Sequence, residues 1–117
     1  MAKVALVCNG AEPKSLFPTF VLGASAAASG DDVYVFFTPG ATDALKPGVV
    51  EGMKKKGFPD LIEMWNGVKS LGGKLYFCEL ALEACDVKKE DMRDDVELVG
   101  ATTFLTEIQG AQITFSF

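Results

Sequence analysis

The chain has 117 residues, a formal net charge of −5 at pH 7 and no histidine. Its length predicts a single domain over residues 1–117 with its own hydrophobic core. The acidic charge argues against nucleic acid as a partner, because phosphate binding needs a basic face. The absence of imidazole excludes Cys-His and Ser-His catalytic pairs. We interpret the one cationic cluster, at residues 54–56 (KKK), as a solvated helix end.

The sequence predicts neither a membrane span nor a leader. The longest helix-length apolar run, residues 17–28, is shorter than the ~20 residues that cross a bilayer. A strand-like run follows Lys3 directly, with no small-residue cleavage site after it. Three cysteines cannot all pair within one chain, so we expect reduced thiols and a cytoplasmic location. No Cys-x2-Cys spacing is present, and we predict no metal site and no cofactor.

Strands and helices alternate along the chain. Residues 3–8 (KVALVC) form a continuous apolar run that is typical of a buried parallel strand. A helix follows from Pro13 to about Ser29 and ends at Gly30. The next expected elements are a strand at 33–38, helical turns at 41–46 and 49–56, a helix at 60–71, a strand at 74–78 and a helix at 79–85. The remaining expected elements are a charged turn at 88–93, a strand at 96–99, a helix at 100–107 and an edge strand at 112–117.

The helical segments differ in the faces they present. The helix at 13–29 carries a surface of glycine and alanine that allows close approach to a sheet, another helix or another subunit. Apolar residues three or four apart form one stripe on the helix at 60–71, namely Leu61, Met64, Val68 and Leu71. The short helix at 79–85 has three apolar residues that we expect to face the core, Leu80, Leu82 and Ala84.

Alternating strands and helices imply mostly parallel pairing with right-handed crossovers. We therefore predict a three-layer α/β/α domain with a mostly parallel sheet of about five strands. The pattern does not imply an order for the strands.

Cys78 is the leading candidate for a functional residue. It is the last residue of the expected strand at 74–78 and directly precedes a helix. First-turn N–H groups and the helix dipole favour a thiolate at this position. Ligand crevices of open α/β sheets lie outside the carboxyl ends of the strands. The alternative interpretation is that Cys78 is a small buried hydrophobic residue. Glu79 beside it opposes the thiolate, although an acidic residue near a helix start is also an ordinary choice.

The other two cysteines lie elsewhere on the predicted elements. Cys8 ends the first strand, so we expect it to face the same crevice as Cys78. Cys85 lies seven residues after Cys78, about 10 Å along an intact helix, which is too far for a disulfide. We interpret Cys85 as a packing thiol.

Glycine-containing turns after the strands offer a second type of candidate. Such turns can direct backbone N–H groups at an anion, although tight turns without a ligand are the plainer interpretation. None matches a dinucleotide or phosphate-loop pattern. Together with Cys78, the expected crevice residues are Cys8, Asn9, Gly10, Thr38, Gly40, Glu79 and Gly100.

Three segments in order resemble the DsrE/DsrF-like family, in the branch often described as DsrE-like or peroxiredoxin-like. They are KVALVCNGAEPKSLFPTFVLGASAAASGDDVYVFFTPGAT, FPDLIEMWNGVKSLGGKLYFC and FCELALEACDVKKEDMRDDVELVGATTFL. The resemblance implies a flavodoxin-like or Rossmann-like layer, assembly into trimers or hexamers, and a cysteine that carries sulfur as a persulfide. Cys78 matches the position of that cysteine. Leu80 and the Ala84-Cys85-Asp86 turn depart from the branch pattern, which leaves open a separate use of Cys85.

Two hypotheses for function follow. The first is a cysteine-persulfide sulfur carrier or sulfurtransferase, in which Cys78 exchanges sulfur with donor and acceptor proteins. The second is a non-catalytic oligomeric module that binds a small ligand or a partner peptide. Thiol peroxidase activity is a weaker third idea, because the chain has no Thr-x-x-Cys motif.

Overall fold

A computed structural model describes residues 1–117 and contains one sheet of five parallel strands. The strand order is β4-β3-β2-β1-β5. The strands are β1 (Lys3–Cys8), β2 (Asp32–Phe37), β3 (Lys74–Cys78), β4 (Glu97–Val99) and β5 (Ile113–Ser116). The predicted fold class is confirmed, and the strand at the C-terminal end of the chain is an edge strand as expected.

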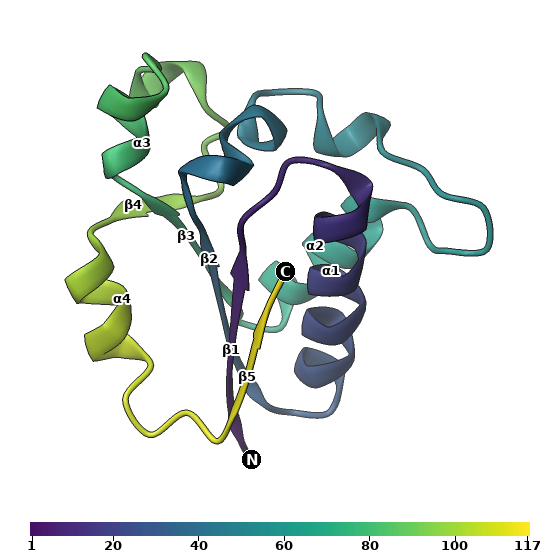
Figure 1. Ribbon diagram of the computed structural model, residues 1–117. Helices are drawn as coiled ribbons and strands as arrows, with labels where there is room; N and C mark the ends of the chain where they lie inside the picture. The colour runs from purple at the N-terminus through teal and green to yellow at the C-terminus, as the bar shows by residue number, and fades with distance from the viewer.

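Helices cover both faces of this sheet, which gives the three expected layers (Figure 1). The helices α1 (Pro13–Ala28) and α2 (Leu61–Ser70) lie on one face, and α4 (Ala101–Glu107) lies on the other. The α1/α2 face holds a cluster of 22 buried residues, whereas the α4 face holds six. Most of the hydrophobic stabilisation therefore comes from the α1/α2 side, because it scales with buried apolar area.

The α1/α2 layer is held by aromatic stacking and by small residues. Trp65 of α2 stacks on Phe20 of α1, with ring centroids 4.9 Å apart. Gly23 of α1 faces Val68, since a Cβ built on this glycine lies 3.6 Å from the valine methyl. The small residues of α1 thus serve packing within the chain. Leu71 does not continue the buried stripe of α2, because it caps the helix and is exposed.

The α4 layer is thinner and is fixed by two side chains. Phe104 stacks on Phe36 of β2, with ring centroids 4.5 Å apart. The Tyr76 hydroxyl donates a 3.0 Å hydrogen bond to Glu107 at the last turn of α4. Burial and the neighbouring Glu107 carboxylate raise the pKa of Tyr76 to about 12, so the phenol remains a donor at neutral pH.

Two local predictions are wrong, and two short helical segments are present with other bounds than predicted. The short helix expected at 41–46 is the 3-10 helix η1 (Pro39–Leu45), and the helical turn expected at 49–56 is limited to η2 (Val50–Gly52). The lysines at 54–56 therefore lie in a loop and do not end a helix. The helix α3 (Leu80–Ala84) buries Ala81 but leaves Leu80 68% exposed and Ala84 exposed, because the helix is too short to reach across the sheet.

No helix of the chain combines the length and the apolar character needed to span a bilayer.

Candidate functional site

The carboxyl ends of all five strands meet at one edge of the sheet. The segments that follow β2 and β3, η1 and α3, lie over this edge and contact each other (Figure 1). The sequence predicts a crevice at this edge. All three cysteines lie near it, but their environments differ.

Cys78 is the last residue of β3 and lies directly before the N-cap of α3, as predicted. The residue is only 4% exposed. It belongs to the smaller apolar cluster, with Val99 paired to it on β4 and Phe36 and Phe104 in the same cluster. The structure agrees with the alternative interpretation of Cys78 as a small buried residue, because the aromatic side chains of the α4 face enclose it.

Cys8 lies on the opposite face of the sheet from Cys78, so the two thiols do not share a crevice as predicted. Paired residues on neighbouring strands point to the same face. Cys8 is paired with Phe37, and Phe37 with Phe77, so Cys78 points the other way. Burial raises the pKa of the Cys8 thiol, although hydrogen bonds with Gly10 and Thr19 oppose that effect.

Cys85 is the exposed thiol, and its interpretation as a packing residue is wrong. It caps the C-terminus of α3. Its Sγ accepts a 3.4 Å hydrogen bond from the Thr42 hydroxyl and donates to the Pro39 carbonyl oxygen at 3.7 Å. Cys85 thus ties α3 to η1 at the carboxyl edge, and all three cysteines are free.

The remaining predicted crevice residues form two separate groups at this edge. Thr38 donates a hydrogen bond to the Asn9 side chain, and a Cβ on Gly40 would collide with the Asn9 carbonyl oxygen. At the second group, the Glu79 N–H donates to the Val99 carbonyl oxygen, and a Cβ on Gly100 would lie 2.9 Å from the Glu79 carboxylate.

The predicted residues do not line a common cavity among those described. Gly10 packs against Ser15 and joins neither group. None of the eight predicted residues lines any of four cavities of the chain. The glycines at this edge serve close packing of neighbouring segments, which is the plainer of the two interpretations of the turns.

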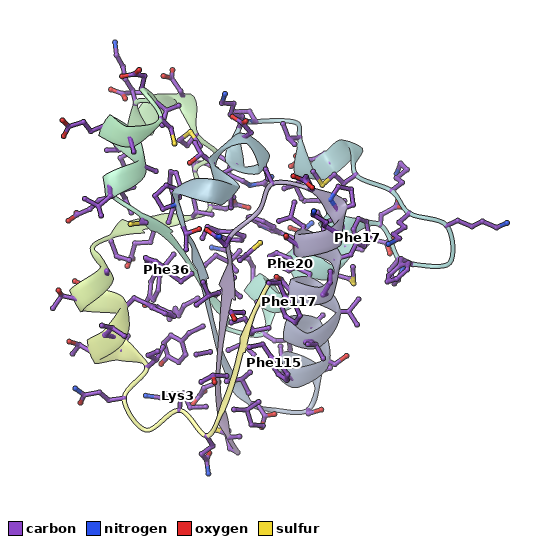
Figure 2. All side chains as sticks on the ribbon, in the orientation of Figure 1. Lys3, Phe17, Phe20, Phe36, Phe115 and Phe117 are labelled. Carbon is purple, nitrogen blue, oxygen red and sulfur yellow. The ribbon has the colours of Figure 1, made fainter.

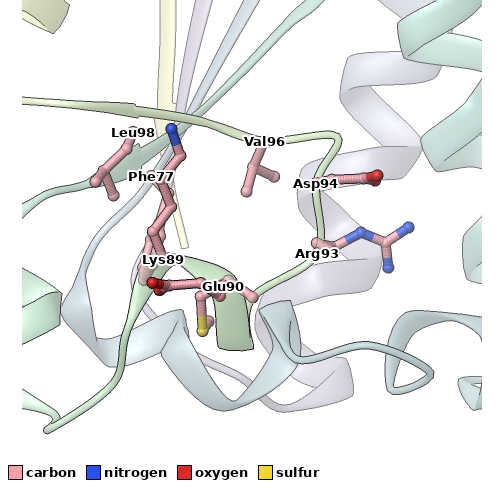
Figure 3. Close-up of a pocket in the computed structure, with 8 residues that line it drawn as sticks. Phe77, Lys89, Glu90, Arg93, Asp94, Val96 and Leu98 are labelled. Carbon is pink, nitrogen blue, oxygen red and sulfur yellow. The ribbon is translucent and has the colours of Figure 1, made fainter.

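The most enclosed cavity, of about 440 Å³, lies beside β4 and was not predicted. Its apolar wall comprises Phe77, Met92, Val96 and Leu98. Lys89, Glu90, Arg93 and Asp94 line the cavity as well, and Figure 3 shows the Arg93 guanidinium and the Asp94 carboxylate turned away from Phe77 and Leu98. The lone apolar Met92 within a charged segment is the sequence signal that could have found it, because that residue is buried.

A charged network holds the rim of this cavity in place. Arg93 donates to both carboxylate oxygens of Asp95 and to both of Glu51, and its guanidinium lies 4.4 Å from the Trp65 ring centroid. Trp65 Nε1 donates a further 2.8 Å hydrogen bond to Asp95. Burial alone would raise the pKa of Asp95, but the hydrogen bonds from Arg93 and Trp65 outweigh it and lower that pKa.

The chemistry available at these sites is that of thiols and carboxylates. No group of three or more His, Cys, Asp or Glu side chains is arranged to hold a metal ion. Cys85 is the thiol that reacts without a structural change, and Cys78 is the thiol that reacts only after its cover opens.

Sequence and structure comparisons agree with this architecture. The sequence model of the DsrE/DsrF-like family matches residues 1–117. The chain belongs to the DsrE/DsrF-like family.

Relatives of this DsrE/DsrF-like chain support the fold. An uncharacterised protein of Methanocaldococcus jannaschii, MJ0760, is 36% identical over 66 residues, which are 56% of this chain and 24% of that protein. The chain therefore spans about a quarter of that relative's length. The crystal structure of the ychN protein from E. coli superposes with a TM-score of 0.77 at 20% identity, covering 100% of both chains.

A second solved structure is a protein of unknown function, MTH1491 from Methanobacterium thermoautotrophicum. It superposes with a TM-score of 0.72 at 10% identity, and the match covers 98% of this chain and 97% of that one. At these identities the two solved structures establish the fold of the chain.

Proposed function

We propose that this DsrE/DsrF-like protein is a sulfur carrier, in which Cys78 holds sulfane sulfur as a persulfide. The Cys78 thiolate attacks the outer sulfur of a donor persulfide, and the donor leaves as a thiolate. An acceptor thiolate then attacks the sulfur held on Cys78 and releases the Cys78 thiolate, so the two exchanges involve no net oxidation.

The position of Cys78 carries this proposal. The thiol ends β3 at the carboxyl edge, directly before α3, in a chain that belongs to a family whose resemblance implies a carrier cysteine there. The reaction needs no histidine, metal or cofactor, which agrees with the residues present.

Access to Cys78 requires α4 to move, because the apolar cluster that encloses the thiol includes Phe104 of this helix. The helix has seven residues, and Phe104 is the one residue that it buries. Segments with few buried apolar contacts open locally at low free energy. A donor or acceptor protein that displaces α4 would therefore reach the thiol without unfolding the sheet.

The test is to load the protein with a small inorganic polysulfide and to map the added sulfur by peptide mass. One added sulfur atom is expected on the Cys78 peptide, and it should pass to an added acceptor thiol. Cys85→Ser removes the exposed thiol that polysulfide also modifies, and this variant and Cys8→Ser should load normally at Cys78. Absence of added sulfur on the Cys78 peptide in Cys85→Ser would reject Cys78 as the carrier.

The alternative function is a non-catalytic oligomeric module that binds a small ligand or a partner peptide. The burial of Cys78 and the separate cavity beside β4 favour it. The volume of this cavity, about 440 Å³, lies within the range of ligand pockets. If Cys78 stays unmodified by sulfur donors even in the presence of candidate partner proteins, this alternative replaces the carrier.

The carrier proposal includes self-association and a reducing compartment. The family resemblance implies trimers or hexamers. Two leucines are exposed to solvent, Leu80 on α3 (68%) and Leu105 on α4 (62%), and they are candidates for subunit contacts. We place the protein in the cytoplasm, where three free cysteines stay reduced.

A further inference from the structure

A second cavity, of about 410 Å³, lies between α1, the loop at 53–60 and the end of the chain. Its wall is almost entirely apolar and comprises Phe17, Pro18, Val21, Leu22, Phe58 and Phe117. Figure 2 shows Phe17 and Phe117 on neighbouring elements, with Phe115 further along β5. We call this site the lysine-rimmed pocket, because the only polar residues that line it are Lys14 and Lys55.

The loop at 53–60 builds one wall of the pocket. Phe58 near its tip packs edge-on against Phe17 of α1, with ring centroids 5.4 Å apart at an angle of 72°. Two contacts close the loop at its base. Leu61 N–H donates a hydrogen bond to the Met53 carbonyl oxygen, and Lys54 forms a 2.8 Å salt bridge with Asp60. Phe58 remains 40% exposed, so a large aromatic ring is held in place with one side open.

The rim of the pocket is positively charged in an otherwise acidic protein. Lys55 Nζ lies 5.1 Å from the Phe58 ring centroid and has no carboxylate partner. Lys14 makes one exposed salt bridge, at 3.4 Å to Glu12, and exposed pairs of this kind are weak. No acidic residue lines the pocket.

An apolar cavity with cations alone at its rim selects a molecule with an apolar body and an anionic end. At about 30 Å³ per heavy atom, taken from the volume of a water molecule, the cavity of about 410 Å³ holds roughly 14 heavy atoms. We propose that the lysine-rimmed pocket binds a medium-chain alkyl carboxylate, with the chain between the three phenylalanine rings and the carboxylate at Lys55 and Lys14. This site is independent of the sulfur chemistry proposed for Cys78.

The test is a titration of the full chain with decanoate below its micelle concentration, followed by backbone amide NMR shifts. Saturable shifts are expected at Lys55, Phe58, Val21 and Phe117. Decanol lacks the charge and should bind about threefold more weakly, as expected for an exposed ionic contact. Decylamine reverses the charge and should bind more weakly still.

Matched variants separate the pocket from general charge effects. Lys55→Gln should weaken decanoate binding about threefold, whereas Lys56→Gln, in the same loop but not lining the pocket, should leave it unchanged. Phe58→Ala removes an apolar wall and should weaken binding about tenfold or more. Because Phe58 is at an exposed loop, this variant should keep the amide spectrum of the core.

Several results would overturn the proposal. Absence of saturable shifts would do so, and so would equal binding of decanol and decanoate or equal effects of the two lysine variants. Binding to vesicles of phosphatidylglycerol and phosphatidylcholine without any decanoate shift would assign the face to a membrane surface instead. Concentration-dependent association that Phe58→Ala abolishes would assign it to a second copy of the chain.

Discussion

Three cysteines in one chain have three different chemical environments. Cys85 is exposed and accepts a hydrogen bond from Thr42. Cys78 is enclosed by the apolar α4 face, and Cys8 is buried in the main core with a raised pKa. Reactivity toward small reagents depends on both exposure and thiolate fraction, so these environments predict different rates.

We expect iodoacetamide to alkylate the native protein first at Cys85, then at Cys78 and last at Cys8. A local opening of α4 that costs about 3 kcal/mol would make Cys78 roughly a hundredfold slower than Cys85. Cys8 requires opening of the main core and should track global unfolding. The measurement is a time course of modification at each cysteine peptide by mass spectrometry. Modification of Cys8 as fast as Cys78 would contradict the order.

At the scale of elements, α4 controls access to Cys78. The sequence indicated a helix at 100–107 but did not show which thiol this helix would cover. In the folded chain Phe104 is the one buried residue of α4, and it belongs to the apolar cluster that contains Cys78. The short helix α3 supplies no residue to that cluster, since its buried residue, Ala81, belongs to the main core.

Weakening α4 should therefore expose Cys78 selectively. Phe104→Ala removes the buried ring that stacks on Phe36, and such a truncation costs about 3 kcal/mol. The expected result is a roughly hundredfold faster alkylation of Cys78, which would approach the rate of Cys85. The readout is the same time course, with Cys8 as the internal reference.

Leu105→Ala is the matched control, because Leu105 is in the same helix but 62% exposed. It keeps the packing of α4 and should change the rate of Cys78 by less than about threefold. Equal effects of the two alanine variants would show that packing of Phe104 does not hold the cover. An unchanged rate in both would mean that Cys78 opens only with the whole domain.

At the scale of the molecule, sequence patterns predicted the elements but not the site. Continuous apolar runs such as 3–8 and 74–78 identify buried strands, because both faces are covered. The site depends on strand register, and a shift of one residue changes the face of every side chain. Cys8 and Cys78 were expected at one crevice because the sequence does not show the strand register. They lie on opposite faces, since Cys8 is level with Phe77.

Long-range polar contacts were equally hidden from the sequence. Trp65 of α2 is far in the sequence from Arg93 and Asp95, and nothing in the local patterns indicates that it meets them. The network joins α2 to the segment before β4, and so fastens the edge of the sheet that has the shortest strand. Its contribution to stability should depend on pH through Asp95.

The pKa of Asp95 in the folded chain lies below its ordinary value of 3.8. A lowered pKa of a carboxyl group stabilises the folded state fully above the unfolded-state pKa, and the contribution disappears as pH falls through the folded-state pKa. Asp95→Asn should lower the free energy of unfolding by about 2 kcal/mol at pH 7, the range for hydrogen bonds to a charged group. The deficit should shrink below about pH 4, where wild-type Asp95 also becomes protonated.

Urea denaturation of both proteins at pH 7 and near pH 3 measures this difference directly. Asp94→Asn provides the control, because Asp94 is the exposed neighbour and makes no side-chain hydrogen bond or salt bridge. It should change stability by less than about 0.5 kcal/mol at either pH. A deficit in Asp95→Asn that stays constant from pH 7 to pH 3 would mean that the carboxylate charge is not what holds β4, since the loss would then come from the altered side chain alone.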